Sequence, residues 1–190
     1  MLYGINSRRK LIKNLDKSYY SLLKAYEYMD REKEIVPAGE WLLDNLYLIE
    51  KEYKDIKHNM PSRYYKDLPI LAKGNMRGFP RIYNLALEIV TKTDGRVEEI
   101  NIEALVKEFQ NVEVLTCGEL WVLPIMLRIA LIQNIGVVVE KILFSQKEKD
   151  IADKLADRLI YASLNKKTPS GGTGSAASHG ESAACQALLA

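Results

Sequence analysis

The sequence predicts an all-α bundle of about five to six helices, with one long irregular crossing and a disordered C-terminal tail. Apolar residues recur at three- and four-residue steps through most of the chain, as they do on one face of a helix. No segment shows the period-two alternation that is typical of a half-buried strand bounded by turns. Hydrophobic residues make up 47% of the 190 residues and charged residues 27%, which excludes a wholly disordered or collagen-like chain.

Three helices are predicted in the first half of the chain. The first covers about residues 7–30, and the second begins at Pro37, where the missing amide hydrogen of proline costs nothing. Residues 61–80 contain three prolines and two glycines, so we expect an irregular crossing there. Pro80 then starts the third helix, and Gly95 is available for a left-handed cap at its end.

Three further helices are predicted in the second half. Asn101 is the expected N-cap of the fourth helix, with Ile100 and Leu105 forming a hydrophobic staple across it. Thr116 and Glu119 have the spacing of a capping box at the start of the fifth helix. The sixth helix is expected over residues 147–165, with its apolar residues on one face.

The composition changes sharply near Thr168. Residues 168–190 are mostly Gly, Ser and Ala and contain one charged residue, so they cannot offset the entropy of ordering. The predicted domains are therefore a helical domain over 1–167 and a disordered tail over 168–190. His179 and Cys185 lie in this tail, and we discount both as ligands.

Residues 120–139 form an apolar run of the length that spans a bilayer, for which about 20 residues suffice. Arg128 lies near the centre of this run, where an arginine costs about 2.5–3.5 kcal/mol in a membrane. A helix that is apolar nearly all round also suits the centre of a soluble bundle. We therefore expect a buried core helix here and no membrane span within the chain. The N-terminus, which has no long apolar run after its basic residues, does not resemble a signal peptide.

The charge balance argues against a nucleic-acid partner. The chain has 27 Lys and Arg against 25 Asp and Glu, and its net charge of +2 is too small for a strong electrostatic footprint. The mixed-charge surface, the pI near 8.4 and the basic stretch SRRKLIK, residues 7–13, favour a partner protein or weak nucleic-acid binding. The two cysteines cannot form a disulfide framework and indicate a reducing compartment.

The sequence shows no catalytic residues, no cofactor site and no metal site, which leaves open whether the chain is an enzyme. No glycine-rich phosphate motif is present. Glu40 and Asp44 would share one helix face, which favours a solvated edge over a hydrolase that uses them with Glu119. His58 is expected to be an ordinary residue at a helix C-terminus, and Cys117 a small residue of a helix first turn.

Aromatic residues supply the remaining candidates for ligand contact. Tyr64 and Tyr65, in the irregular crossing, are placed either to stack on sugar rings or to pack their rings inward. Arg81 and Tyr83, just after Pro80, are candidates for a pocket or for the scaffold, and the scaffold is favoured.

Four motifs in order resemble the region near the N-terminus of cyclic β-1,2-glucan synthases. They are EWLLDN, a P-x-x-YY-x-x-LP segment, PRIY, and GELW followed by P-x-x-LR, within about residues 37–140. The matched positions are Glu40, Trp41, Asp44, Asn45, Tyr64, Tyr65, Pro80, Arg81, Tyr83, Glu119, Trp121 and Arg128.

The resemblance implies a fragment of a large enzyme of the inner membrane that builds glucan from UDP-glucose. The glycosyltransferase region of that family lies outside this chain, so the fragment is expected to be non-catalytic and cytoplasmic, held at the membrane by its parent. Its expected partners are the other domains of the synthase and β-1,2-glucan. The candidate ligand or docking residues are Tyr64, Tyr65, Arg81, Tyr83, Glu119 and Trp121.

Two functions follow from these observations. The first is a helical module of a glucan synthase, acting as a scaffold for neighbouring domains or as a contact for the glucan, and it predicts an exposed surface that carries the motifs. The alternative is a free-standing helical protein-interaction module.

Overall fold

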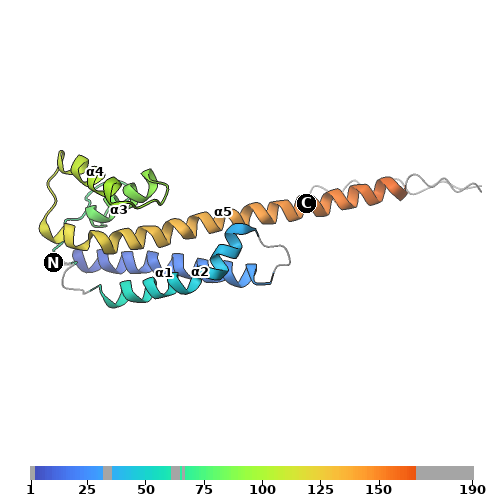
Figure 1. Cartoon of the computed structure of the whole chain (residues 1–190), viewed down its shortest axis with the longest axis horizontal. Helices are drawn as coiled ribbons and strands as arrows, with labels where there is room; N and C mark the ends of the chain where they lie inside the picture. The colour runs from blue at the N-terminus through green and yellow to red at the C-terminus, as the bar shows by residue number, and fades with distance from the viewer. Residues whose placement is uncertain (1–2, 32–35, 61–64, 66, 166–190) are drawn as a thin grey trace, which may run out of the picture. The chain divides into compact units, whose positions relative to one another are not determined.

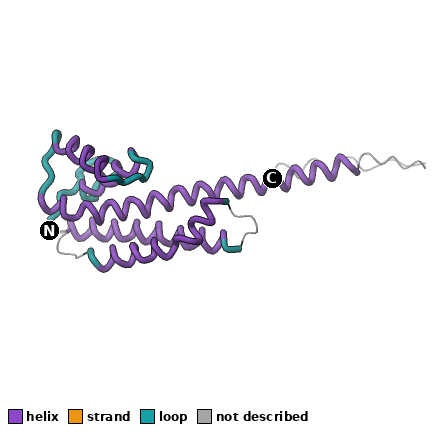
Figure 2. The backbone as a smooth tube through the Cα atoms, in the orientation of Figure 1, coloured by secondary structure: helices purple, strands orange, loops and turns teal. Residues whose placement is uncertain are grey.

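The computed structural model describes residues 3–31, 36–60, 65 and 67–165. Over these residues the structure is all-α, as predicted, with no strand beyond an isolated bridge between Ile70 and Pro80 (Figure 2). The helices are α1 (Tyr3–Met29), α2 (Pro37–His58), α3 (Arg81–Lys92), α4 (Glu99–Gln110) and α5 (Cys117–Asn165) (Figure 1).

The chain divides into two compact units, residues 1–147 and residues 148–190. The first unit contains α1 to α4 and α5 as far as Lys147. In the second unit the described residues are the remainder of α5, on which Ile151, Leu155 and Leu159 are exposed. The predicted tail, 168–190, lies outside the described residues, so its disorder stays a prediction.

Helices α1 and α2 pack against each other along their apolar faces (Figure 1). The rings of Tyr19 and Tyr53 stack with their centroids 4.0 Å apart. The Tyr53 hydroxyl donates to an Asp16 carboxylate oxygen at 2.7 Å, and Lys57 Nζ donates to the same oxygen at 3.1 Å. Apolar packing and one small polar cluster therefore hold the pair together.

Helix α5 contributes the most apolar segment of the core. Met126, Ile129 and Ala130 are fully buried, and Gly136 lies so close to α1 that a Cβ there would be 3.5 Å from the Ser18 Cβ. By length and composition alone α5 is long and apolar enough to cross a membrane, and 50% of its most apolar window is buried within the protein.

The described part of the crossing before α3, residue 65 and residues 67–80, is irregular, as its prolines and glycines predict, and the remainder of the predicted crossing lies outside the described residues. Gly74 and Gly78 both adopt positive φ, +82° and +84°, where a residue with a Cβ would be strained. Gly95 closes α3 in the predicted manner, because it also has a positive φ and its amide donates to the Val90 carbonyl at 2.8 Å. Helix α4 packs on α3 through half-buried apolar residues.

Two sequence expectations about helix boundaries are wrong. Asn101 is not an N-cap, because α4 begins at Glu99 with Glu98 as its cap, and Ile100 is exposed and makes no staple. The predicted fifth and sixth helices are one continuous helix, α5. The segment around Lys147 contains no glycine or proline, so nothing in its backbone chemistry ends the helix there.

Candidate functional site

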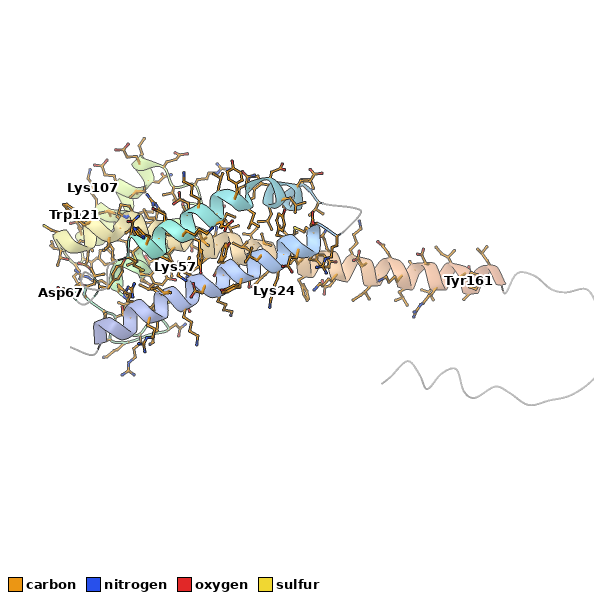
Figure 3. The ribbon with its side chains drawn as sticks, turned by 90° about the horizontal axis from the view of Figure 1, so that it is seen from below. Lys24, Lys57, Asp67, Lys107, Trp121 and Tyr161 are labelled. Carbon is orange, nitrogen blue, oxygen red and sulfur yellow. The ribbon has the colours of Figure 1, made fainter. Side chains whose placement is uncertain are left out.

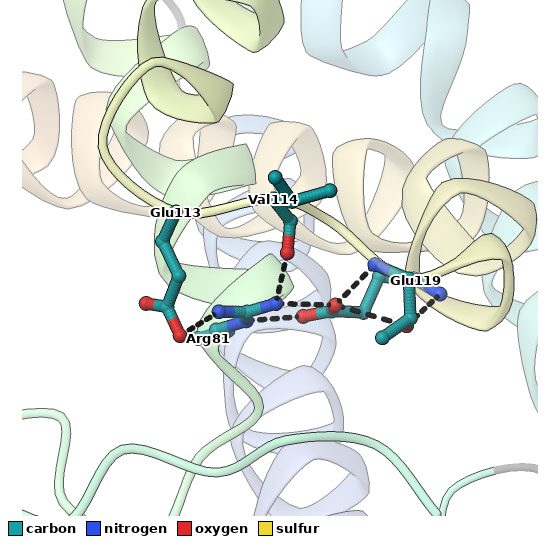
Figure 4. Close-up of polar contacts among 5 residues, drawn as sticks. Arg81, Glu113, Val114 and Glu119 are labelled. Atoms are coloured by element: carbon teal, nitrogen blue, oxygen red, sulfur yellow. Dashed lines mark hydrogen bonds and ion pairs between the residues drawn. The ribbon is translucent and has the colours of Figure 1, made fainter.

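Arg81 and Glu119 form a buried ion pair that joins the start of α3 to the first turn of α5 (Figure 4). Arg81 Nε donates to Glu119 Oε1 at 2.6 Å, and Arg81 Nη2 donates to Oε2 at 2.8 Å. Nη2 also donates to the Val114 carbonyl at 2.9 Å, while Nη1 pairs with the Glu113 carboxylate. The pairing is bidentate, which is the strongest geometry for arginine and a carboxylate.

The same glutamate also forms the predicted capping box. The backbone N–H and the hydroxyl of Thr116 both donate to Glu119 Oε2 at 2.9 Å, and the Glu119 N–H donates to the Thr116 hydroxyl at 3.3 Å. Glu119 is fully buried. Its carboxylate therefore stabilises the N-terminus of α5 and anchors α3 at once.

The electrostatics of this pair do not suit acid–base chemistry. Burial raises the pKa of Glu119, but hydrogen bonds from Arg81 and Thr116 outweigh burial and hold the pKa below its ordinary value. The hydrogen bond to Glu119 raises the pKa of Arg81 against the opposing effect of burial. Both carboxylate oxygens of Glu119 already accept hydrogen bonds, so this buried pair is a structural joint between α3 and α5.

The predicted tyrosines occupy different environments. Tyr83 is buried, and its hydroxyl donates to the Gln133 side chain on α5. Burial raises the pKa of Tyr83 above its ordinary value. Tyr65 is fully buried, and burial raises the pKa of its phenol to about 12. Tyr64 lies outside the described residues.

Trp121 is the most exposed of the predicted candidates that the structure describes. Its side chain is 76% exposed near the N-terminal end of α5 (Figure 3). The structure thus brings together Arg81 and Glu119 but leaves Trp121 separate from them on the surface. Within the part of the chain that the structure describes, no group of three or more His, Cys, Asp and Glu is placed to hold a metal ion.

An apolar groove with a volume of about 410 Å³ lies between α2 and α5. We call it the α2–α5 groove, and its lining residues are Trp41, Asn45, Leu48, Ile49, Glu52, Arg128, Leu131, Ile132 and Ile135. Trp41 is 49% exposed there.

The polar groups of the groove are engaged with one another or with the backbone. Arg128 Nη1 lies 2.9 Å from Asp55 Oδ2 and 3.4 Å from Glu52 Oε2. Asn45 donates to the Trp41 carbonyl at 2.8 Å. Sequence reasoning placed three lining residues, Trp41, Asn45 and Arg128, at motif positions but did not select them as site candidates. Their common presence in the motifs was the available signal.

The chain is similar in sequence to a known glucan synthase. This relative is the cyclic beta-(1,2)-glucan synthase NdvB of Rhizobium meliloti (strain 1021), which is 37% identical over 126 residues. The matched stretch is 66% of this chain but 4% of the length of NdvB. No protein-family profile matches the chain. The similarity supports a relationship to a glucan synthase, in agreement with the motifs.

Proposed function

We propose that the chain is a non-catalytic helical module of a cyclic β-1,2-glucan synthase-like protein and acts as a scaffold for another part of that polypeptide. The observation that carries the proposal is the α2–α5 groove, because motif residues from two distant segments line it. Trp41 and Asn45 come from the EWLLDN motif, and Arg128 ends the motif that begins GELW. Neighbouring domains are expected to dock on an exposed surface of this kind.

The chemistry of the groove favours a protein helix over a sugar. Six of its nine lining residues are apolar, and an apolar groove between two helices suits the apolar face of an amphipathic helix. A glucan would need free hydrogen-bonding groups. Arg128 and Asn45 already have partners within the module, so they offer few unsatisfied groups to sugar hydroxyls.

The charged residues at the α2–α5 groove indicate which charge a docked helix should carry. Arg128 faces two carboxylates, those of Glu52 and Asp55, so this cluster carries a net negative charge. We infer an amphipathic helix with a lysine or arginine beside its apolar face. The glycosyltransferase that uses UDP-glucose would lie elsewhere in the polypeptide, and the module would be cytoplasmic, at the inner membrane through its parent.

A chimera tests the scaffold function. The stretch of NdvB that matches this chain is replaced by the corresponding stretch of this chain, and cyclic β-1,2-glucan synthesis is measured in membranes. Leu48→Arg places a charge in the α2–α5 groove, and we expect synthesis to fall strongly. Tyr47→Arg is the matched control, because Tyr47 is 65% exposed on the same helix and does not line the groove.

Two results would argue against the scaffold. Equal synthesis in the Leu48→Arg and Tyr47→Arg chimeras would show that the groove has no role in assembly. A folded chimera without any synthesis would favour the free-standing interaction module.

Calorimetric titration of the chain with linear β-1,2-gluco-oligosaccharides distinguishes the scaffold function from the remaining candidate function, a contact for the glucan. The scaffold predicts no saturable heat. Saturable binding that is lost in Trp41→Ala or Trp121→Ala would instead make the module a glucan contact.

A further inference from the structure

Helix α1 carries a row of basic side chains on the face opposite the core. Leu11, Leu15 and Leu22 are fully buried on the inner face. The exposed residues Lys10, Lys13, Lys17 and Lys24 follow at steps of three, four and seven, so they share one line along the helix. We call these four residues the α1 lysine row, and Figure 3 labels Lys24 on it.

The described residues provide no ion-pair partner that neutralises the charge of the row. Asp16 is the only acidic residue of α1 before Glu27, and it is occupied by Lys57 and Tyr53 of α2. Arg9, beside the row, is also exposed and adds a further positive charge.

The irregular crossing extends the basic surface at one end. Lys10 Nζ lies 5.7 Å from the centroid of the Phe79 ring and only 3.0 Å from the position a Cβ would take on Gly78. The same loop carries Lys73 and Arg77, both exposed. Positive charge therefore runs along α1 and continues into the loop that contacts it.

We propose that the α1 lysine row docks the module onto the surface of an anionic lipid bilayer. Lys24 lies 14 positions after Lys10, so the row extends over about 21 Å of helix. A bilayer offers a flat, fluid array of negative headgroups that gather beneath such a line, and clusters of four to eight basic residues are typical of this binding.

A nucleic acid fits the row less well. Recognition of single strands needs aromatic platforms between the basic residues, and Tyr20, 58% exposed, is the one exposed aromatic residue on the described part of α1. The net charge of the whole chain is +2, which gives no strong field to attract a polyphosphate. The α1 lysine row lies on one face of the module, and a flat bilayer contacts a protein through one face.

Vesicle co-sedimentation of the full chain tests the proposal. We expect binding to phosphatidylcholine vesicles that contain phosphatidylglycerol, no binding to phosphatidylcholine alone, and a steep loss with added salt. Each lysine near the surface contributes about fivefold in partitioning, equivalent to about 1 kcal/mol. Replacing all four lysines of the row by glutamine should therefore lower binding by several hundredfold, roughly fivefold compounded four times.

The matched control removes the same charge elsewhere. It replaces Lys51, Lys92, Lys107 and Lys141, which are exposed on four other helices, by glutamine. Glutamine and lysine have similar helix propensities, so both variants should keep their helical circular dichroism. We expect the control to bind vesicles far more tightly than the row variant.

Three results would overturn the proposal. They are equal binding to neutral and anionic vesicles, equal losses in the row and control variants, and tighter binding of the chain to a short DNA duplex than to anionic vesicles at the same salt concentration. None of them bears on the α2–α5 groove, so this proposal stands or falls separately from the scaffold function.

Discussion

Replacing Arg81 by methionine should strongly destabilise the module. The variant removes both hydrogen bonds from Arg81 to the Glu119 carboxylate and leaves this fully buried carboxylate with the Thr116 N–H and hydroxyl as donors. Breaking a buried pair from one side typically costs about 3–5 kcal/mol. Because Thr116 still donates hydrogen bonds to the carboxylate, we expect the free energy of unfolding to fall by about 3 kcal/mol, near the lower end of this range.

The loss should depend on pH in a defined direction. In the native protein the pKa of Glu119 is lowered relative to the unfolded chain. The stability that its charge contributes is therefore present at neutral pH, and it is lost as the pH falls from the pKa of the unfolded chain through the lower pKa of the folded protein. In Arg81→Met, burial is no longer opposed by the arginine, and the carboxyl group takes up a proton at a higher pH. The difference between the two proteins should therefore narrow from about pH 7 to about pH 4.

Urea denaturation followed by far-UV circular dichroism measures this difference. At neutral pH the thermal midpoint should also fall by about 6–12 °C for a domain of this size. The double variant with methionine at both 81 and 119 should recover much of the loss, because it buries no unpaired charge. A loss below about 1 kcal/mol, or one that is the same at both pH values, would refute the role assigned to the ion pair.

Two further predictions concern other parts of the module. Gly95→Ala should lower the free energy of unfolding by about 1 kcal/mol, because Gly95 has a φ of +78° that alanine adopts poorly. Urea denaturation measures this change, and an unchanged midpoint would contradict the prediction. The pKa of Tyr65 is raised to about 12 by burial, so the folded protein keeps the phenol proton that the unfolded chain releases near pH 10. Stability should therefore fall as pH rises from about 10 to 12, and Tyr65→Phe should flatten this fall; an equally steep fall in the variant would contradict it.

Local sequence signals predicted the elements whose cause is local. The apolar steps of α1, the proline at the start of α2 and the Thr116–Glu119 capping box each depend on residues within one or two turns. The predicted N-cap at Asn101 and the predicted staple at Ile100 were wrong, because the same local pattern can begin a helix at more than one residue. The N-cap of α4 is Glu98 instead. The merging of two predicted helices into α5 was readable from the absence of a breaker near Lys147.

The candidate site was predictable only in its parts. The sequence singled out Arg81 and Glu119 separately, and nothing in their spacing of 38 residues indicated that they pair. Trp41 and Arg128 stood at motif positions 87 residues apart in the chain, and their common groove was equally hidden. Contacts of this range depend on how helices pack, which local propensity does not encode.

The order of amino acids was enough to predict the helical class of this protein, most helix starts, the basic composition of α1 and the likeness to glucan synthases. Which side chains are buried depended on how the helices pack against one another. This packing buried Tyr65 and left Trp121 in solvent, although both are aromatic residues at motif positions. The physical reason is that the period of a helix defines its apolar face, whereas the burial of one side chain depends on which distant helix lies against it.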